Sequence, residues 1–260
     1  YILPISHDEI VYGKCSMLQK MSGQNEEEKF ASYRAFLGYM MAHPGKKLLF
    51  MGQEFAQKNE WNYETQLDWE LLEQPAHKQM EQFSQDLNKF YLEHPALWQD
   101  DDSWQGFSWI SHDDYQQSVI AFRRIDDDGK EIIAICNFCP VQRNDYKIGV
   151  PKEGRYQTVF NTDAAVYGSG ITEKKFETLP ISMHGFEQCI SMTLAPLSVL
   201  YLEYAPVKKR APRKTTAAKS TTTKKAAVKP KKTVIRTESA AKPTASVSAR
   251  KKKATKSESV

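Results

Sequence analysis

Two short apolar runs are each followed by ionisable side chains that could do chemistry. Residues 1–5 are followed by His7 and Asp8, and residues 48–51 are followed by Glu54. Continuous apolar runs of this length are typical of buried parallel strands. Alpha/beta barrels carry their chemistry at the carboxyl ends of such strands. We therefore expect Asp8 and Glu54 to approach one another on the same rim of a barrel.

The residue types leave several roles open. A carboxylate such as Asp8 can act as a nucleophile, donate a proton or hold a sugar, and the alternative is an Asp that caps a loop. Glu54 can contact a substrate or orient another group, and we favour the supporting role. Trp61 and Trp69 lie in a long aromatic loop. Either can stack on a sugar ring or fill the small core of its own loop, and the stacking role is better supported for Trp61.

The elements that must position these residues alternate along the first hundred residues. Asn25 is placed to cap a helix whose first turn holds three glutamates, and the stretch His43-Pro44-Gly45 ends it. A second helix is predicted over roughly residues 76–94, with an apolar stripe at helical spacing. With the two apolar runs, this predicts the last strand and helix units of a (β/α)8 catalytic barrel over residues 1–100.

From about residue 104 the pattern changes to short runs rich in β-branched and aromatic residues. The motif Asp126-Asp127-Asp128-Gly129 is a strong hairpin signal. Seven strands are predicted, at residues 107–111, 119–124, 131–137, 146–150, 156–160, 189–194 and 198–204. Residues 101–205 are therefore predicted to form an all-β C-terminal domain, an antiparallel β-sandwich.

The charge of the chain divides sharply near residue 205. Of 36 basic and 32 acidic residues, 18 basic and two acidic ones lie at 206–260, so that segment carries about +16 and residues 1–205 about −12. The segment is rich in Lys, Ala, Thr and Pro and has few large apolar side chains, so we predict a disordered tail. Such a tail can bind a polyanion such as nucleic acid without sequence preference, or act only as a solubilising appendage.

Several classes of site and location are disfavoured by the sequence. No apolar run approaches the roughly 18 residues of a membrane helix. Four scattered cysteines favour a reducing, cytoplasmic setting over a disulfide scaffold. Cys136 and Cys139 have the spacing of a metal half-site, but no second pair exists, so a buried apolar role is favoured for Cys136. We expect no metal and no cofactor.

Four stretches carry a family resemblance. Residues 3–14 (LPISHDEIVYGK), 39–55 (YMMAHPGKKLLFMGQEF), 60–62 (EWN) and 67–69 (LDW) resemble the glycogen branching enzymes of bacteria, which are members of the alpha-amylase clan. The resemblance covers about residues 1–204, and the first two motifs are highly specific. It implies transfer of an α-1,4-glucan segment to form an α-1,6 branch in glycogen biosynthesis, by a retaining double displacement.

The resemblance also implies roles for individual residues. Asp8 corresponds to the carboxylate that stabilises the transition state, and His7 and Trp61 are expected to bind the glucan. The nucleophile and the proton donor of the family have no counterpart in this chain. The chain also begins at Tyr1, within a predicted strand. We therefore expect a C-terminal fragment of a longer protein, inactive alone. The alternative is a carbohydrate-binding or scaffolding module with a polyanion-binding tail.

Overall fold

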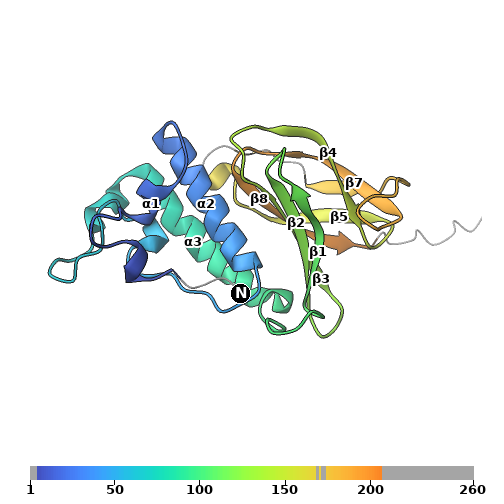
Figure 1. The fold of residues 1–260 in the computed structure, drawn as a ribbon, viewed down its shortest axis with the longest axis horizontal. Helices are drawn as coiled ribbons and strands as arrows, with labels where there is room; N and C mark the ends of the chain where they lie inside the picture. The colour runs from blue at the N-terminus through green and yellow to red at the C-terminus, as the bar shows by residue number, and fades with distance from the viewer. Residues whose placement is uncertain (1–4, 168–169, 171–173, 207–260) are drawn as a thin grey trace, which may run out of the picture. The chain divides into compact units, whose positions relative to one another are not determined.

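The computed structural model describes residues 5–167, 170 and 174–206. In this part of the chain helices come first and strands follow (Figure 1). The α-helices are α1 (Met17–Lys20), α2 (Glu26–Ala42) and α3 (Pro75–Glu93). The strands are β1 (Phe107–Asp114), β2 (Val119–Ile125), β3 (Glu131–Asn137), β4 (Arg143–Val150), β5 (Arg155–Asn161), β6 (Lys175–Glu177), β7 (Gln188–Leu194) and β8 (Ser198–Ala205). Short 3₁₀ helices cover His7–Glu9, Gln53–Phe55, Trp69–Glu73, Pro95–Leu97 and Ala165–Tyr167.

Helix α2 begins as its sequence predicts. The Asn25 side chain accepts a hydrogen bond from the Glu28 amide at 2.8 Å, and three glutamates occupy the first turn, where they face the positive end of the helix dipole. The helix ends before His43, and Gly45 takes a positive φ of 116° in the turn that follows. Because α2 packs against α1, α3 and the sheet, it is buried on most sides rather than along one stripe.

Helix α3 is amphipathic and starts with Pro75 at its first position, where the missing amide costs nothing. Its buried stripe is the predicted one and comprises Met80, Phe83, Leu87 and Phe90. The helix ends at Glu93, just before a proline. In Figure 1, α2 and α3 lie side by side on one side of the strands.

The strands form the predicted antiparallel sandwich. One sheet has six strands in the order β1-β2-β3-β8-β5-β6, and the other pairs β4 with β7. The hairpin between β2 and β3 closes where Asp126 accepts a hydrogen bond from Gly129, whose φ is +73°. Seven of the eight strands were predicted, and the three-residue strand β6 was missed.

The six-stranded sheet is covered on both faces. Phe122, Ala134 and Tyr201 pack with the helices in one core, and Ile133 and Leu202 pack against β4 and β7 in a second core. All seven residues of β3 are therefore buried, without the alternation of a half-exposed strand.

Helix α2 has a glycine, Gly38, where it packs closely against the sheet. The Tyr201 hydroxyl donates a hydrogen bond to the carbonyl oxygen of Gly38. A methyl group at that position would lie 2.6 Å from Cγ2 of Thr162. The helix can therefore lie this close to the sheet only because the residue has no side chain.

The prediction of a strand at residues 48–51 is wrong in the structure. Residues 46–50 belong to no helix or strand and pair with no strand among the described residues, and Leu48 and Met51 are 36% and 49% exposed. An apolar run becomes a strand only when a neighbouring strand accepts its hydrogen bonds. The first predicted strand lies mostly in residues 1–4, outside the described residues. The barrel over residues 1–100 thus stays a prediction.

The prediction of a disordered basic tail at 206–260 lies outside the described residues, apart from Pro206. Within the part of the chain that is described, no helix combines the length and apolarity needed to cross a lipid bilayer.

Candidate active-site loop

The His7-Asp8-Glu9 motif forms a short 3₁₀ helix that its own side chains hold in place. The Glu9 carboxylate accepts a hydrogen bond from the Ser6 amide at 2.8 Å, and the Asp8 carbonyl accepts one from the Lys14 ammonium at 2.6 Å. These contacts use Glu9 and the backbone of Asp8. The side chains of His7 and Asp8 stay accessible, with exposed fractions of 52% and 71%.

The loop that contains Glu60 and Trp61 is held against the segment that follows this motif by hydrogen bonds to main-chain atoms. Glu60 accepts hydrogen bonds from the amides of Gly13 at 3.0 Å and Cys15 at 2.6 Å. The Trp61 amide donates to the carbonyl of Ile10 at 3.1 Å. The hydrogen bonds from Gly13 and Cys15 hold the pKa of the Glu60 carboxyl below its ordinary value. Glu60 thus acts as an ionised clamp between the two loops.

The clamp brings three predicted site residues together. His7 Nε2 lies 3.2 Å from the Asp8 carboxylate. The His7 and Trp61 ring centroids are 6.2 Å apart, and the Phe50 ring lies 5.3 Å from Trp61 and 6.2 Å from His7. The result is an accessible carboxylate and imidazole beside a half-buried indole. This arrangement can accept hydrogen bonds from hydroxyl groups and present an apolar ring face to the same ligand.

Glu54 lies in the 3₁₀ helix Gln53–Phe55, which is hydrogen-bonded to other helices of the chain. Its carbonyl accepts a hydrogen bond from the Ser84 hydroxyl at 2.7 Å, and the Tyr33 hydroxyl donates to the neighbouring Gln53 carbonyl at 3.0 Å. Burial, and then the charge of Glu54, raise the pKa of Tyr33. Among the described residues, no hydrogen bond or ion pair joins the Glu54 carboxylate to His7 or Asp8. The supporting role therefore stays the better-motivated prediction.

Trp69 lies apart from the group, with its ring centroid 5.3 Å from that of Phe55 and an exposed fraction of 49%. No metal centre is evident: within the described ranges, no cluster of three His, Cys, Asp or Glu side chains is placed to bind an ion. Cys136 is buried in the core as predicted, and burial raises the pKa of its thiol.

Sequence reasoning missed Glu60 as the clamp. The residue belongs to the motif at 60–62, but its partners are main-chain amides, which nearly every residue type has and which the sequence therefore cannot identify. One indirect signal was available. Gly13 takes a φ of +78°, and a glycine shortly after a charged motif indicates a tight turn that brings the backbone close to another group.

Comparison with known proteins shows which families this chain is similar to. Residues 109–205 match a family model described as "Alpha amylase, C-terminal all-beta domain". The chain is 50% identical over 209 residues to the 1,4-alpha-glucan branching enzyme GlgB of Aquifex aeolicus, covering 78% of this chain and 33% of that protein. It is 46% identical over 204 residues to GlgB of Aromatoleum aromaticum (78% and 32% covered) and 44% identical over 216 residues to GlgB of Oceanobacillus iheyensis (82% and 34% covered).

Among solved structures, an alpha-amylase from H.orenii aligns with a TM-score of 0.49 at 16% identity, covering 77% of this chain and 39% of that one. The chain spans about a third of the length of the branching enzymes it matches. Residues 109–205 thus match the alpha-amylase C-terminal all-beta domain, within a chain that matches part of the 1,4-alpha-glucan branching enzymes over 78–82% of its length.

Proposed function

We propose that this chain is the C-terminal part of a 1,4-alpha-glucan branching enzyme, which cleaves an α-1,4 linkage and joins the released segment to another glucose as an α-1,6 branch. The proposal is supported by relatives at 44–50% identity that carry this name. It is also supported by the accessible group of His7, Asp8 and Trp61, in which the motif residues meet. Residues 1–100 are proposed to complete a (β/α)8 barrel in the whole enzyme.

The proposed reaction is a retaining double displacement. A nucleophilic carboxylate attacks the anomeric carbon while a carboxylic acid gives its proton to the departing glucosyl oxygen. The 6-hydroxyl of an acceptor glucose then attacks the anomeric carbon of the glycosyl-enzyme intermediate and displaces the nucleophilic carboxylate. The proton of this hydroxyl passes to the carboxyl group that acted as the acid in the first step. Both reacting groups belong to parts of the enzyme outside the motifs present here.

Asp8 is proposed to act as a third carboxylate that holds sugar hydroxyls as the ring flattens. A hydrogen bond to an ionised oxygen is stronger than one between neutral groups. If the contact tightens only in the transition state, it raises the rate of the chemical step rather than the affinity for the ground state. The 3.2 Å contact with His7 orients the Asp8 carboxylate, and His7 can bind the same sugar.

Trp61 is proposed to bind a glucose ring at the side of His7. Its indole contacts the Phe50 ring edge-on, and its amide donates to the Ile10 carbonyl, so the ring is positioned before the ligand arrives. Glu54 is proposed to support this surface through the 3₁₀ helix that it shares with Gln53, whose side chain accepts a hydrogen bond from the Phe50 amide at 3.0 Å.

The proposal is tested with a chimera. In the Aquifex aeolicus branching enzyme, the corresponding C-terminal part is replaced by residues 1–205 of this chain, and branching of amylose is measured by the loss of iodine colour. We expect an active chimera. Asp8→Asn should lower kcat by about 10²–10³-fold, which is the usual cost of one electrostatic contact to a transition state.

The matched control is Asp113→Asn, which changes an exposed carboxylate on β1 and is expected to leave kcat unchanged. Equal activity of the Asp8→Asn chimera and its parent would refute the role of Asp8. The 260-residue chain alone is expected to give no branching, because we expect it to contain neither the nucleophilic carboxylate nor the proton donor. Turnover by this chain would contradict that expectation.

A further inference from the structure

The outer face of the two-stranded sheet is covered by a segment outside both sheets. In this sheet β4 and β7 pair with Gly149 opposite Cys189. Alternate residues of β7 pack into the second core, so Cys189 points to the opposite face; these core residues are Ile190, Met192 and Leu194. Cys189 is nevertheless fully buried. A further part of the chain must therefore cover it.

Residues 179–187, which we call the strap, form this cover. The main-chain groups of Leu179 and Cys189 exchange two hydrogen bonds, at 2.7 and 3.1 Å. Farther along the strap, the Met183 carbonyl passes so close to Gly149 that a Cβ on this glycine would lie 2.1 Å from the carbonyl oxygen. The strap can therefore lie against β4 only because this residue of the strand has no side chain.

A tight turn in the strap presents one imidazole to β4. Met183 and Phe186 exchange two main-chain hydrogen bonds, at 3.0 and 2.9 Å, and so close a two-residue turn. Between them, His184 and Gly185 take positive φ angles of 52° and 80°, the pattern of a type I′ turn. The turn thus fixes the direction in which the His184 side chain leaves the backbone.

The His184 imidazole accepts a hydrogen bond from the main chain of β4. The Gly149 amide donates to His184 Nδ1 at 3.2 Å. A main-chain amide can only donate, so Nδ1 carries no proton in this contact and the neutral ring holds its proton on Nε2. Protonation of Nδ1 places two donors against each other and breaks the contact. Gly149 is buried, so water can replace the lost acceptor only if the strap moves away.

Charged groups near the strap give the protonated ring a different preferred direction. On this side of the domain they are Asp113 and Asp114 on β1, Arg123 on β2, Lys147 on β4 and Glu187 in the strap. The two aspartates act on His184 itself. Arg123 faces the neighbouring Phe186 ring, with its guanidinium carbon 5.5 Å from the ring centroid. A charged imidazole is therefore drawn towards β1 and away from the amide on β4.

The closed strap favours the neutral imidazole. Burial lowers the pKa of His184 below its ordinary value of 6.5, and the charges of Asp113 and Asp114 oppose this effect without cancelling it. For a histidine whose folded pKa is lowered, the stabilising contribution is complete above the ordinary pKa. It is lost as the pH falls through the lower value of the folded protein.

We propose that His184 is a pH-dependent latch: the neutral imidazole holds the strap over β4 and β7, and protonation releases the strap so that the outer face of this sheet becomes accessible. The second core keeps the side chains that β4 and β7 contribute to it, because they lie on the inner face. The latch shares no residue with the His7-Asp8 loop, so its test is independent of the proposed function.

Amide exchange at Gly149 measures the latch directly. Exchange rates in the 260-residue chain are followed by NMR from pH 7 to pH 5 and compared with the intrinsic rate at each pH. We expect the protection of the Gly149 amide to fall below pH 6.5, by up to about 10-fold per pH unit. The Gly154 amide is the matched control. It donates to the Thr178 hydroxyl at 2.9 Å, which does not titrate in this range, so its protection should stay constant.

Three variants test the chemistry of the latch. His184→Asn keeps an acceptor that does not titrate, in a residue that tolerates a left-handed backbone, and should keep Gly149 protected at every pH. His184→Phe keeps a ring without an acceptor and should leave Gly149 weakly protected throughout. Asp113→Asn removes a charge that favours the protonated ring and should move the fall in protection to lower pH.

Thiol labelling reports whether the whole strap moves. The chain is treated with dithiodipyridine between pH 7 and pH 5, and mass spectrometry locates the modified cysteines. Labelling of Cys189 relative to the exposed Cys15 should increase as the pH falls, and it should not increase in His184→Asn. Cys136 in the first core should stay unlabelled, which separates release of the strap from unfolding.

Three results would overturn the latch. The first is protection of Gly149 that does not vary with pH. The second is a pH response of the His184→Asn variant equal to that of the parent. The third is labelling of Cys136 together with Cys189, because acid would then unfold the domain rather than release the strap.

Discussion

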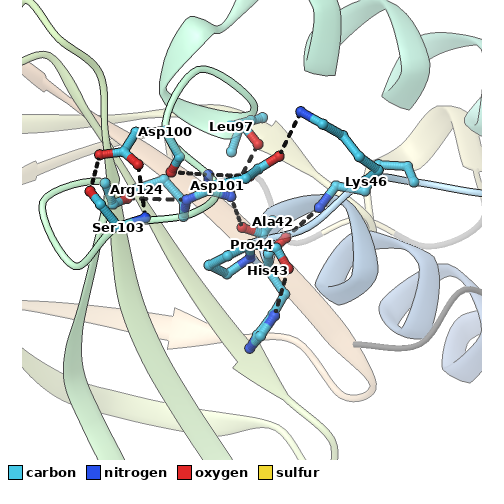
Figure 2. Close-up of polar contacts among 11 residues, drawn as sticks. Ala42, His43, Pro44, Lys46, Leu97, Asp100, Asp101, Ser103 and Arg124 are labelled. Carbon is cyan, nitrogen blue, oxygen red and sulfur yellow. Dashed lines mark hydrogen bonds and ion pairs between the residues drawn. The ribbon is translucent and has the colours of Figure 1, made fainter. Parts of the chain in front are cut away.

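Replacing Arg124 by methionine should destabilise the protein far more than an ordinary arginine substitution. Methionine keeps much of the apolar volume but provides no donor for the Asp101 carboxylate or for four carbonyl oxygens, those of Ala42, Leu97, Asp100 and Gly106 (Figure 2). Arg124 and Asp101 have side-chain exposures of 0% and 3%, so the carboxylate would stay buried without its main partner. Removing one member of a buried pair typically costs about 3–5 kcal/mol. Lys46 remains within 3.3 Å of Asp101, but it is 82% exposed and returns at most about 1 kcal/mol.

The expected net loss is therefore about 3 kcal/mol, which with an m-value near 2 kcal/mol/M lowers the urea midpoint by about 1.5 M. Urea unfolding of the 260-residue chain, followed by tryptophan fluorescence, measures it. Arg155→Ala is the matched control, because Arg155 forms a mostly exposed pair with Glu177 at 2.6 Å and should cost at most about 1 kcal/mol.

A double substitution tests the physical reason. Asp101→Asn in the Arg124→Met background removes the stranded charge, so the two losses should fall short of additivity by about 0.5–3 kcal/mol. If Arg124→Met shifts the midpoint no more than the Arg155 control does, or if the two losses simply add, the account of a buried charge held by one guanidinium is wrong.

Three further predictions concern the loops, the helix and the acid response. Glu60→Ala should speed hydrogen exchange at the Gly13 amide about 10-fold or more, and Glu60→Gln should do so less; unchanged exchange would show that the clamp does not hold the loop. Gly38→Ala should lower Tm by the equivalent of about 1–3 kcal/mol, because the added methyl meets Thr162, even though alanine favours a helix by about 1 kcal/mol; a higher Tm would contradict this. Burial opposes the ionisation of Asp101, but hydrogen bonds from Gly45 and Arg124 lower the pKa of its carboxyl, which predicts a stabilising contribution that is complete above the ordinary carboxyl pKa of 3.8 and is lost as pH falls through the lower folded value. Urea midpoints from pH 6 to pH 3 should therefore show the gap between the parent and Asp101→Asn closing on the acid side, and a gap that does not vary with pH would refute it.

Local signals in the sequence were sufficient for the elements that are stabilised locally. Asn25 and the three glutamates after it specify the start of α2, and the aspartates and Gly129 specify the turn between β2 and β3. Short runs of β-branched and aromatic residues, separated by turn residues, were enough to find the long strands of the sandwich. Each of these features depends on residues within a few positions of one another.

Features that depend on distant partners could not be predicted. The apolar run at 48–51 has the composition of a strand, but its residues do not determine whether a neighbouring strand is available to pair with it. Arg124 follows another arginine, and a pair of charges on a strand is ordinarily read as exposed. Its position two residues after Phe122 on the same face was the available clue. Its acceptors are mostly main-chain carbonyls, which every residue has.

For the candidate site too, the residues could be predicted from the sequence but the contacts between their loops could not. His7, Asp8 and Trp61 were selected from their types and motifs, and the structure brings their side chains together. The contacts that join their loops run from Glu60 and Ile10 to backbone atoms. Such contacts depend on the path of the chain rather than on side-chain identity, so only coordinates reveal them.

Within the described residues, a sheet covered by helices on one face and by β4 and β7 on the other is bordered by two edge strands that each pair on one side only. One border is β6, only three residues long, and the other is β1, which carries Trp109. Substitutions that spare both cores are therefore expected only at the exposed positions of β1, such as Trp109 and His112, because Phe107 and Ile110 belong to the two cores. The fully buried β3, by contrast, can tolerate little change without loss of the fold.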